Sequence, residues 1–67
     1  MAVARVTKIV GSSPTSWHAA VNDAVKRANK TLRNLTGIHL LEQKAQIDKG
    51  KIKEYRATIE VTFILED

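Results

Sequence analysis

A long alternation near the C-terminus constrains the fold of this chain more than any other feature. Apolar residues at every second position (Tyr55, Ala57, Ile59, Val61, Phe63 and Leu65) alternate with Arg56, Thr58, Glu60, Thr62 and Ile64. Because successive side chains of a strand point to opposite faces, this period of two predicts a half-buried β-strand. The alternation is longer than a typical strand of about 5–6 residues. One small helix cannot cover such a strand, so we expect the strand to pair with another subunit as well.

The size of the chain also points to a partner. Its 67 residues, 43% of them apolar, form one domain, residues 1–67. A domain this short buries only roughly 60% of the surface that its unfolded chain exposes. Small domains usually add disulfides, a metal or a partner subunit. Because the chain has no cysteine, disulfides and thiolate metal sites are excluded. We favour oligomerisation, with a hard-ion site as the alternative.

Composition suggests where such a protein works. No apolar run approaches the ~20 residues of a membrane span, and Arg5 and Lys8 interrupt the N-terminal apolar stretch. That stretch is therefore not typical of a signal peptide, and we expect a soluble, cytoplasmic protein. The net charge of +4 permits anionic partners such as nucleic acid or phosphorylated cofactors, but moderate basicity is also common on ordinary surfaces.

The N-terminal half has the pattern of a strand followed by a helix. Residues Val3 to Val10 mix β-branched and charged side chains and predict a strand that stops at Gly11. The segment "GSSPTS", residues 11–16, has the composition of a turn. We expect a serine or threonine there to cap the helix, and Pro14 to occupy an early helical position.

Helical spacing then runs from Trp17 to about Leu35. The apolar residues recur at intervals of three and four, and they are Trp17, Ala20, Val21, Ala24, Val25, Ala28, Leu32 and Leu35. At about 100° per residue they form one stripe. The opposite side carries Asn22, Lys26, Lys30 and Arg33. The alanines would let a sheet approach closely, and Gly37 is expected to end the helical segment because glycine tolerates positive φ.

The remaining segments complete a β-α-β-β order. Residues Ile38 to Ile47 predict a second strand, and "DKG", residues 48–50, is a hairpin turn signal. A right-handed crossover makes the first two strands parallel, and the last strand can lie between them, antiparallel to both. The predicted fold is therefore α+β, with a three-stranded antiparallel or mixed sheet wrapped on one helix.

Enzyme signatures are missing from the sequence. There is no Walker loop, no G-x-G-x-x-G and no H-E-x-x-H motif. His18 falls on the predicted helix and His39 on the second strand, with no nucleophile, base and orienting group at a recognisable spacing. We therefore predict that the protein is not an enzyme. An enzyme working at a subunit interface is the weaker alternative.

Two surface features have both an ordinary and a functional interpretation. The basic stripe of the helix fits a nucleic-acid or protein-interaction module, but such stripes are more often solvated faces, and we favour that interpretation. Trp17 begins the apolar stripe. A large aromatic residue at such a position more often anchors a core or an interface than stacks on a ligand.

The carboxylates are too scattered for one chain to hold a hard cation. Such ions need several oxygen ligands, and no EF-hand loop is present. A symmetric oligomer can instead place one carboxylate from each subunit around an axis. The candidates, chosen from chemistry alone, are Glu42, Asp48, Glu54 and Glu60, with calcium or magnesium as the cation.

Three segments together resemble a known family. They are "VTKIVGSSPTSW", the helix "AAVNDAVKRANKTLRNL" and the tail "EYRATIEVTFILED". In this order, and over nearly the whole chain, they are similar to the dodecins. The resemblance implies a β-α-β-β subunit and a hollow homo-dodecamer built of trimers. It also implies a storage or sequestration protein that binds flavins such as riboflavin, FMN or FAD at subunit interfaces.

The flavin positions of the family are only partly kept. Alignment through "TLRNLTGIHL" places Gly37 where a tryptophan usually stacks on the flavin ring, and Arg56 stands at the usual glutamine position. Glu42 matches a family carboxylate, and Ile38 and Gln43 complete the predicted ligand site. Loss of the stacked aromatic costs on the order of 0.5–1.5 kcal/mol beyond area burial, so flavin should bind weakly. The "SPTSW" segment resembles a branch that lacks this tryptophan and is associated with calcium.

Overall fold

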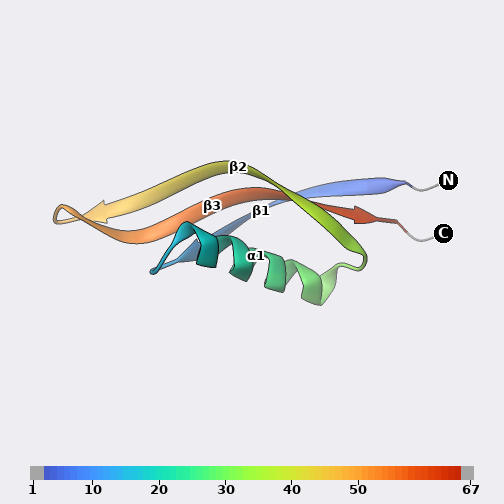
Figure 1. Cartoon of the computed structure of the whole chain (residues 1–67), viewed down its shortest axis with the longest axis horizontal. Coiled ribbons are helices and arrows are strands. Elements are labelled where there is room, and N and C mark those ends of the chain that lie inside the picture. The colour runs from blue at the N-terminus through green and yellow to red at the C-terminus, as the bar shows by residue number, and fades with distance from the viewer. Residues whose placement is uncertain (1–2, 66–67) are drawn as a thin grey trace.

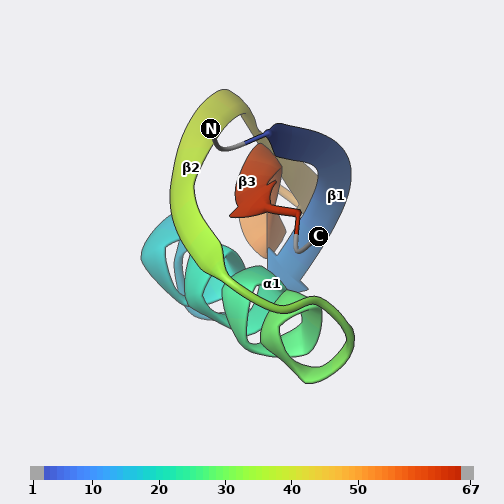
Figure 2. The same cartoon turned by 90° about the vertical axis from the view of Figure 1, so that its right-hand side faces the viewer.

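The fold consists of one helix packed on one face of a three-stranded sheet. A computed structural model describes residues 3–65. The elements are β1 (Ala4–Ser13), α1 (Trp17–Thr31), β2 (Leu35–Asp48) and β3 (Lys51–Ile64). The strand order is β1-β3-β2, and β3 is antiparallel to both of its neighbours. The predicted order, central strand and parallel outer strands are all confirmed (Figures 1 and 2).

The core lies between α1 and the apolar row of β3. Ala57, Ile59, Val61 and Phe63 are buried on the sheet, opposite the buried helix residues Ala20, Ala24 and Ala28. Helical spacing puts these alanines on one face, and their single methyl groups let the helix lie close to the sheet. Figure 2 shows the strands curving over α1, so the sheet wraps the helix as predicted.

A glycine of β1 completes this close approach. Gly11 is buried, and a Cβ at this position would lie 2.2 Å from the Ala20 carbonyl oxygen and 2.9 Å from the Ala24 Cβ. The prediction that Gly11–Ser16 forms a turn is wrong in its first half. Gly11 to Ser13 belong to β1, because they pair with Ala57, Arg56 and Tyr55 of β3.

A serine caps the start of the helix, as predicted, but the proline does not lie inside the helix. Ser16 is the N-cap, and its Oγ accepts a hydrogen bond from the Ala19 N–H at 3.0 Å. Pro14 was expected at an early helical position. It lies before the cap instead, because the helix begins at Trp17.

The helix ends earlier in the chain than the apolar spacing predicts. α1 ends at Thr31, and Leu32 has an extended backbone at the C-cap. Leu32 and Leu35 still pack against the core. Their spacing therefore matches the apolar stripe of the helix, although their backbone is not helical. The turn into β2 uses Asn34, with φ of 61°, because asparagine tolerates the left-handed region. Gly37 does not end the helix, since it lies inside β2 and its φ is not positive.

The hairpin between β2 and β3 is longer than predicted at both strands. Lys49 and Gly50 form its two-residue loop, with φ of 52° and 78°, and Asp48 pairs with Lys51 across it. Positive φ at both loop residues is the signature of a type I′ turn. The predicted turn is confirmed. However, β2 already begins at Leu35, and β3 begins at Lys51, before the clear alternation that starts at Tyr55.

The sheet extends far beyond the helix that covers it. A helix of 15 residues spans about 22 Å, whereas strands of 14 residues span about 46 Å. The described chain measures 52 × 19 × 13 Å. The β2–β3 hairpin projects past one end of α1, and β1 and β3 project past the other (Figure 1).

Candidate functional site

The face of the sheet opposite α1, here called the open face, brings several predicted site residues together. Directly paired residues in a sheet share a face, so the register orders this face into rows across the three strands. The rows run from β1 through β3 to β2 as Ser12–Arg56–Lys44, Val10–Thr58–Glu42, Lys8–Glu60–His39 and Val6–Thr62–Gly37.

Gly37, Glu42 and Arg56 therefore lie on one face, as a common ligand site requires. Each of them is exposed. A Cβ at Gly37 would meet no heavy atom within 4 Å, so this position is open space with no side chain to contact a ligand. In the sequence, only the resemblance to the dodecins connected these residues. The pairing register of the strands gives the physical reason that they share a face.

The other two predicted ligand residues lie on the opposite face of β2. Ile38 pairs with Val61, and Gln43 pairs with Ala57. Both partners belong to the apolar row that faces α1, so Ile38 and Gln43 are not grouped with the open face.

The charges of the open face are locally compensated. Arg56 Nε donates a hydrogen bond to Glu54 Oε1 at 2.8 Å, and Lys44 Nζ lies 3.7 Å from Glu42 Oε1. Most of these side chains are more than half exposed, so solvent screening leaves each pair a small contribution to stability. Arg56 is therefore held beside a carboxylate, which competes with any anionic ligand for its guanidinium.

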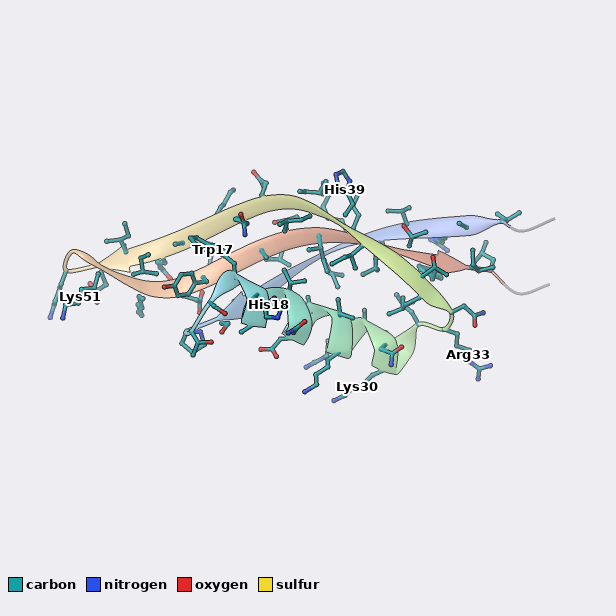
Figure 3. All side chains as sticks on the ribbon, in the orientation of Figure 1. Trp17, His18, Lys30, Arg33, His39 and Lys51 are labelled. Atoms are coloured by element: carbon teal, nitrogen blue, oxygen red, sulfur yellow. The ribbon has the colours of Figure 1, made fainter. Side chains whose placement is uncertain are left out.

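A pair of residues that the sequence did not connect lies in the middle of this face. His39 Nδ1 is 3.4 Å from Glu60 Oε1, and Lys8 occupies the same row on β1. Figure 3 shows His39 on the side of the sheet away from α1. Only the register between strands joins these residues, because they are 21 positions apart in the chain. No local sequence signal reveals the pair.

The predicted metal ligands do not form a cage within one chain. Among residues 3–65, no group of three or more histidine or acidic side chains is placed to hold an ion. Glu54 and Glu60 already have a basic or imidazole neighbour. Asp48 lies beside the hairpin loop, paired with Lys51, about 30 Å along β3 from Glu60 at 3.3 Å per residue.

The aromatic residues lie on the helix side of the sheet. The Trp17 and Tyr55 rings meet edge to face, with centroids 4.8 Å apart. The Trp17 Nε1–H also donates a hydrogen bond of 2.8 Å to the Lys44 carbonyl oxygen. Trp17 therefore fastens the start of α1 to the β2–β3 hairpin, as the anchor interpretation predicts. In the described chain, no tryptophan, tyrosine or phenylalanine lies in the open-face rows.

Two other surface features lie away from the open face. A groove of about 640 Å³ between α1 and β1 has a lining that includes the apolar residues Ile9, Ala28 and Leu32, and also Arg27. The predicted polar side of the helix, Asn22, Lys26, Lys30 and Arg33, is exposed throughout. No helix of the described chain is long and apolar enough to cross a membrane.

Comparison with known proteins agrees with this architecture. The family model named Dodecin matches residues 3–66. The dodecin of Thermus thermophilus is 37% identical over 65 residues, which cover 97% of this chain and 94% of that protein. A protein of Mycobacterium tuberculosis named calcium dodecin is 36% identical over 63 residues, covering 94% of this chain and 89% of that protein.

Solved structures give the same result. A crystal structure of a mutant T. thermophilus dodecin superposes with a TM-score of 0.96 at 36% identity, and all of both chains is covered. The crystal structure of the M. tuberculosis calcium dodecin, described as calcium chelating, has a TM-score of 0.83 at 38% identity over 96% of this chain and 91% of that one. The fold defines a small α+β subunit in which one helix covers one face of a three-stranded sheet. The chain belongs to the dodecin family.

Proposed function

We propose that this dodecin is a non-catalytic homo-dodecamer, built of trimers, that binds or stores a small ligand or divalent cation where its copies meet. The observation that carries this proposal is the surface of the single subunit. Its accessible area is 5212 Å², whereas a compact monomer of 7.4 kDa exposes about 4,200 Å². The excess of about 1,000 Å² exceeds the ~800 Å² that one partner typically buries in a stable interface.

The kind of surface in excess supports the same proposal. The large exposed apolar side chains are Val3, Val6, Val10, Ile38, Leu40, Leu41, Ile47, Ile52 and Leu65. They lie on all three strands and at both ends of the sheet, so several contacts per subunit are needed to cover them. The radius of gyration is 13.8 Å, compared with about 11 Å for a compact chain of this length.

Flavin binding is expected to be weak in this member of the family. A flavin ring is held largely by stacking, but Gly37 is open space, and no tryptophan, tyrosine or phenylalanine of residues 3–65 lies in the open-face rows. The Arg56 guanidinium, which replaces the family glutamine, suits phosphate or carboxylate groups. Glu42 remains available on the same face for the polar part of a ligand.

A divalent cation, calcium or magnesium, is the alternative ligand. The support for it is the similarity to a relative named calcium dodecin. Residues 3–65 of a single chain do not fit such an ion, because the carboxylates among them are dispersed. Glu42, Glu54 and Glu60 share the open face, so we propose that two or more copies together supply the oxygen ligands. Asp48 lies too far along the sheet to join them. The cytoplasmic location stays a prediction.

Native mass spectrometry of the purified protein tests the assembly and its ligand together. We expect a twelve-subunit species, and any retained flavin or cation appears as added mass. A monomer at micromolar concentration would contradict the proposal.

A fluorescence titration of FMN tests the ligand site separately. Gly37→Trp restores a stacking ring and should raise FMN affinity roughly tenfold or more, since ~1.4 kcal/mol is tenfold. Thr36→Trp is the matched control, because Thr36 lies next to Gly37 at a β-bulge outside the open-face rows. Equal gains from both variants, or no gain from Gly37→Trp, would mean that the site is misplaced.

A further inference from the structure

Most of the net charge of the chain lies on α1 and the two residues that follow it. Residues 17–33 contain four basic side chains, Lys26, Arg27, Lys30 and Arg33, and one acidic side chain, Asp23. Three of the four net positive charges of the protein therefore lie in this short segment. We call the four basic residues the basic helix face. All four are exposed, and Figure 3 shows Lys30 and Arg33 directed away from the sheet.

The basic helix face is not neutralised by the protein itself. In residues 3–65, the ion pairs are Lys44–Glu42 and Arg56–Glu54, and both lie on β2 and β3, as does the contact between His39 and Glu60. No ion pair joins Asp23 to a cation of the basic helix face within the described chain. Asp23 lines the same surface hollow as Lys26, Arg27 and Lys30. It is one carboxylate beside four cations, so most of the charge of the basic helix face is left uncompensated.

Helix stability accounts for only part of this arrangement. A cation in the last turn is favoured by the helix dipole, which explains Lys30. Lys26 and Arg27 lie more than one turn before Thr31, where that effect is lost. Asp23, three and four positions before them, is a favourable neighbour, but it offsets only one of the four positive charges. Lys26 and Lys30 are four positions apart, so they are neighbours on the helix surface and their like charges destabilise it slightly.

We propose that the basic helix face binds the phosphate backbone of nucleic acid without sequence preference. This proposal goes beyond ligand storage and uses a different surface from the open face. Lysine and arginine neutralise phosphates and release the counterions that surround a nucleic acid. The four cations occur within two turns of α1 and the residues just after it, so they form a short row that can follow a backbone.

The structure favours nucleic acid over a membrane as the source of these phosphates. A helix that binds a membrane surface inserts an apolar face beside its basic one. The apolar face of α1 is already buried against β1 and β3. The basic helix face also has no aromatic residue on which a base would stack, so contacts to phosphate rather than base recognition are expected.

The proposal is tested with a fluorescein-labelled DNA duplex of arbitrary sequence, by fluorescence anisotropy from 50 to 200 mM salt. The logarithm of affinity should fall with the logarithm of salt by about 0.9 for each phosphate neutralised. The variant Lys26→Gln/Lys30→Gln removes two of four cations, so the salt slope should fall by about half. Lys51→Gln/Lys53→Gln changes the net charge equally on the hairpin and should leave the slope unchanged.

Three results would overturn the proposal. They are no binding at 50 mM salt, an equal loss of slope in both double variants, and preferential binding to phosphatidylserine vesicles over DNA. Circular dichroism and native mass spectra should be the same for both variants, because all four substituted lysines are exposed. FMN binding by the helix variant should also be unchanged, which separates this proposal from the one for the open face.

Discussion

Gly11 is the residue at which the smallest change should have the largest effect on stability. In Gly11→Ala, the new methyl group would lie 2.2 Å from the Ala20 carbonyl oxygen and 2.9 Å from the Ala24 Cβ. The first distance is about 1 Å shorter than an ordinary contact between carbon and oxygen. Neither neighbour is the end of a flexible side chain, so α1 must move away from β1 as a body.

The expected loss is a large part of the total stability. Overpacking of a close-packed core costs typically 1–3 kcal/mol, and contact with a backbone atom places Gly11→Ala near ~3 kcal/mol or above. A chain of this length has an unfolding free energy of only about 3–10 kcal/mol, at 0.05–0.15 kcal/mol per residue. The displacement also separates the buried alanines of α1 from Ile59 and Val61.

The other two glycines are matched controls for the same substitution. Gly37→Ala meets nothing within 4 Å, so a gain of about 0.4–1 kcal/mol from the less flexible unfolded chain is expected. Gly50→Ala also has space, but its φ of 78° costs an alanine roughly 1–2 kcal/mol. The predicted order of stability is Gly37→Ala, then Gly50→Ala, then Gly11→Ala.

Urea denaturation at one fixed protein concentration measures this order, because the stability of an oligomer depends on concentration. Adding Ala24→Gly to Gly11→Ala should restore only part of the loss, since the contact with the Ala20 carbonyl remains. If Gly11→Ala were as stable as Gly37→Ala, the close approach of α1 to β1 would not exist.

Three further predictions concern the cap, the anchor and the exposed apolar surface. Ser16→Ala removes the acceptor for the Ala19 N–H and should lower the unfolding free energy by about 1 kcal/mol, whereas Ser12→Ala should not. Trp17→Phe keeps a ring against Tyr55 but loses the hydrogen bond to the Lys44 carbonyl oxygen. We expect the unfolding free energy to fall by about 0.5–1.5 kcal/mol and amide exchange in the hairpin to become faster. Unchanged exchange would argue against the anchor role. Val10→Asp, on a side chain 63% exposed, should yield smaller assemblies in native mass spectra, while an intact dodecamer would show that this surface is not an interface.

Much of the fold was predictable because its signals are local. The alternation of β3 fixes which of its side chains are buried, and the spacing of Ala20, Ala24 and Ala28 fixes the buried face of α1. The turn at Lys49 and Gly50 follows from the local segment Asp48–Gly50, in which Gly50 accepts positive φ without strain. Each of these signals depends on neighbours a few positions apart, so the sequence alone contains it.

Element ends were harder to predict because tertiary contacts decide them. Leu32 and Leu35 continue the helical spacing, yet they reach the core from extended backbone. Gly11 belongs to a strand because its pairing with β3 and the close packing of α1 outweigh the preference of glycine for turns. Gly37, which the spacing suggested as the end of the helix, is a strand residue, and Asn34 makes the turn.

For the candidate site, the sequence determined the residue types and the structure determined their neighbours. The absence of cysteine, the open position at Gly37 and the arginine at position 56 are properties of the chain by itself. Which side chains share the open face depends on the register of three strands, because pairing of distant residues is set by the whole sheet and not by local spacing. That register brings His39 to Glu60 and separates Ile38 and Gln43 from Glu42.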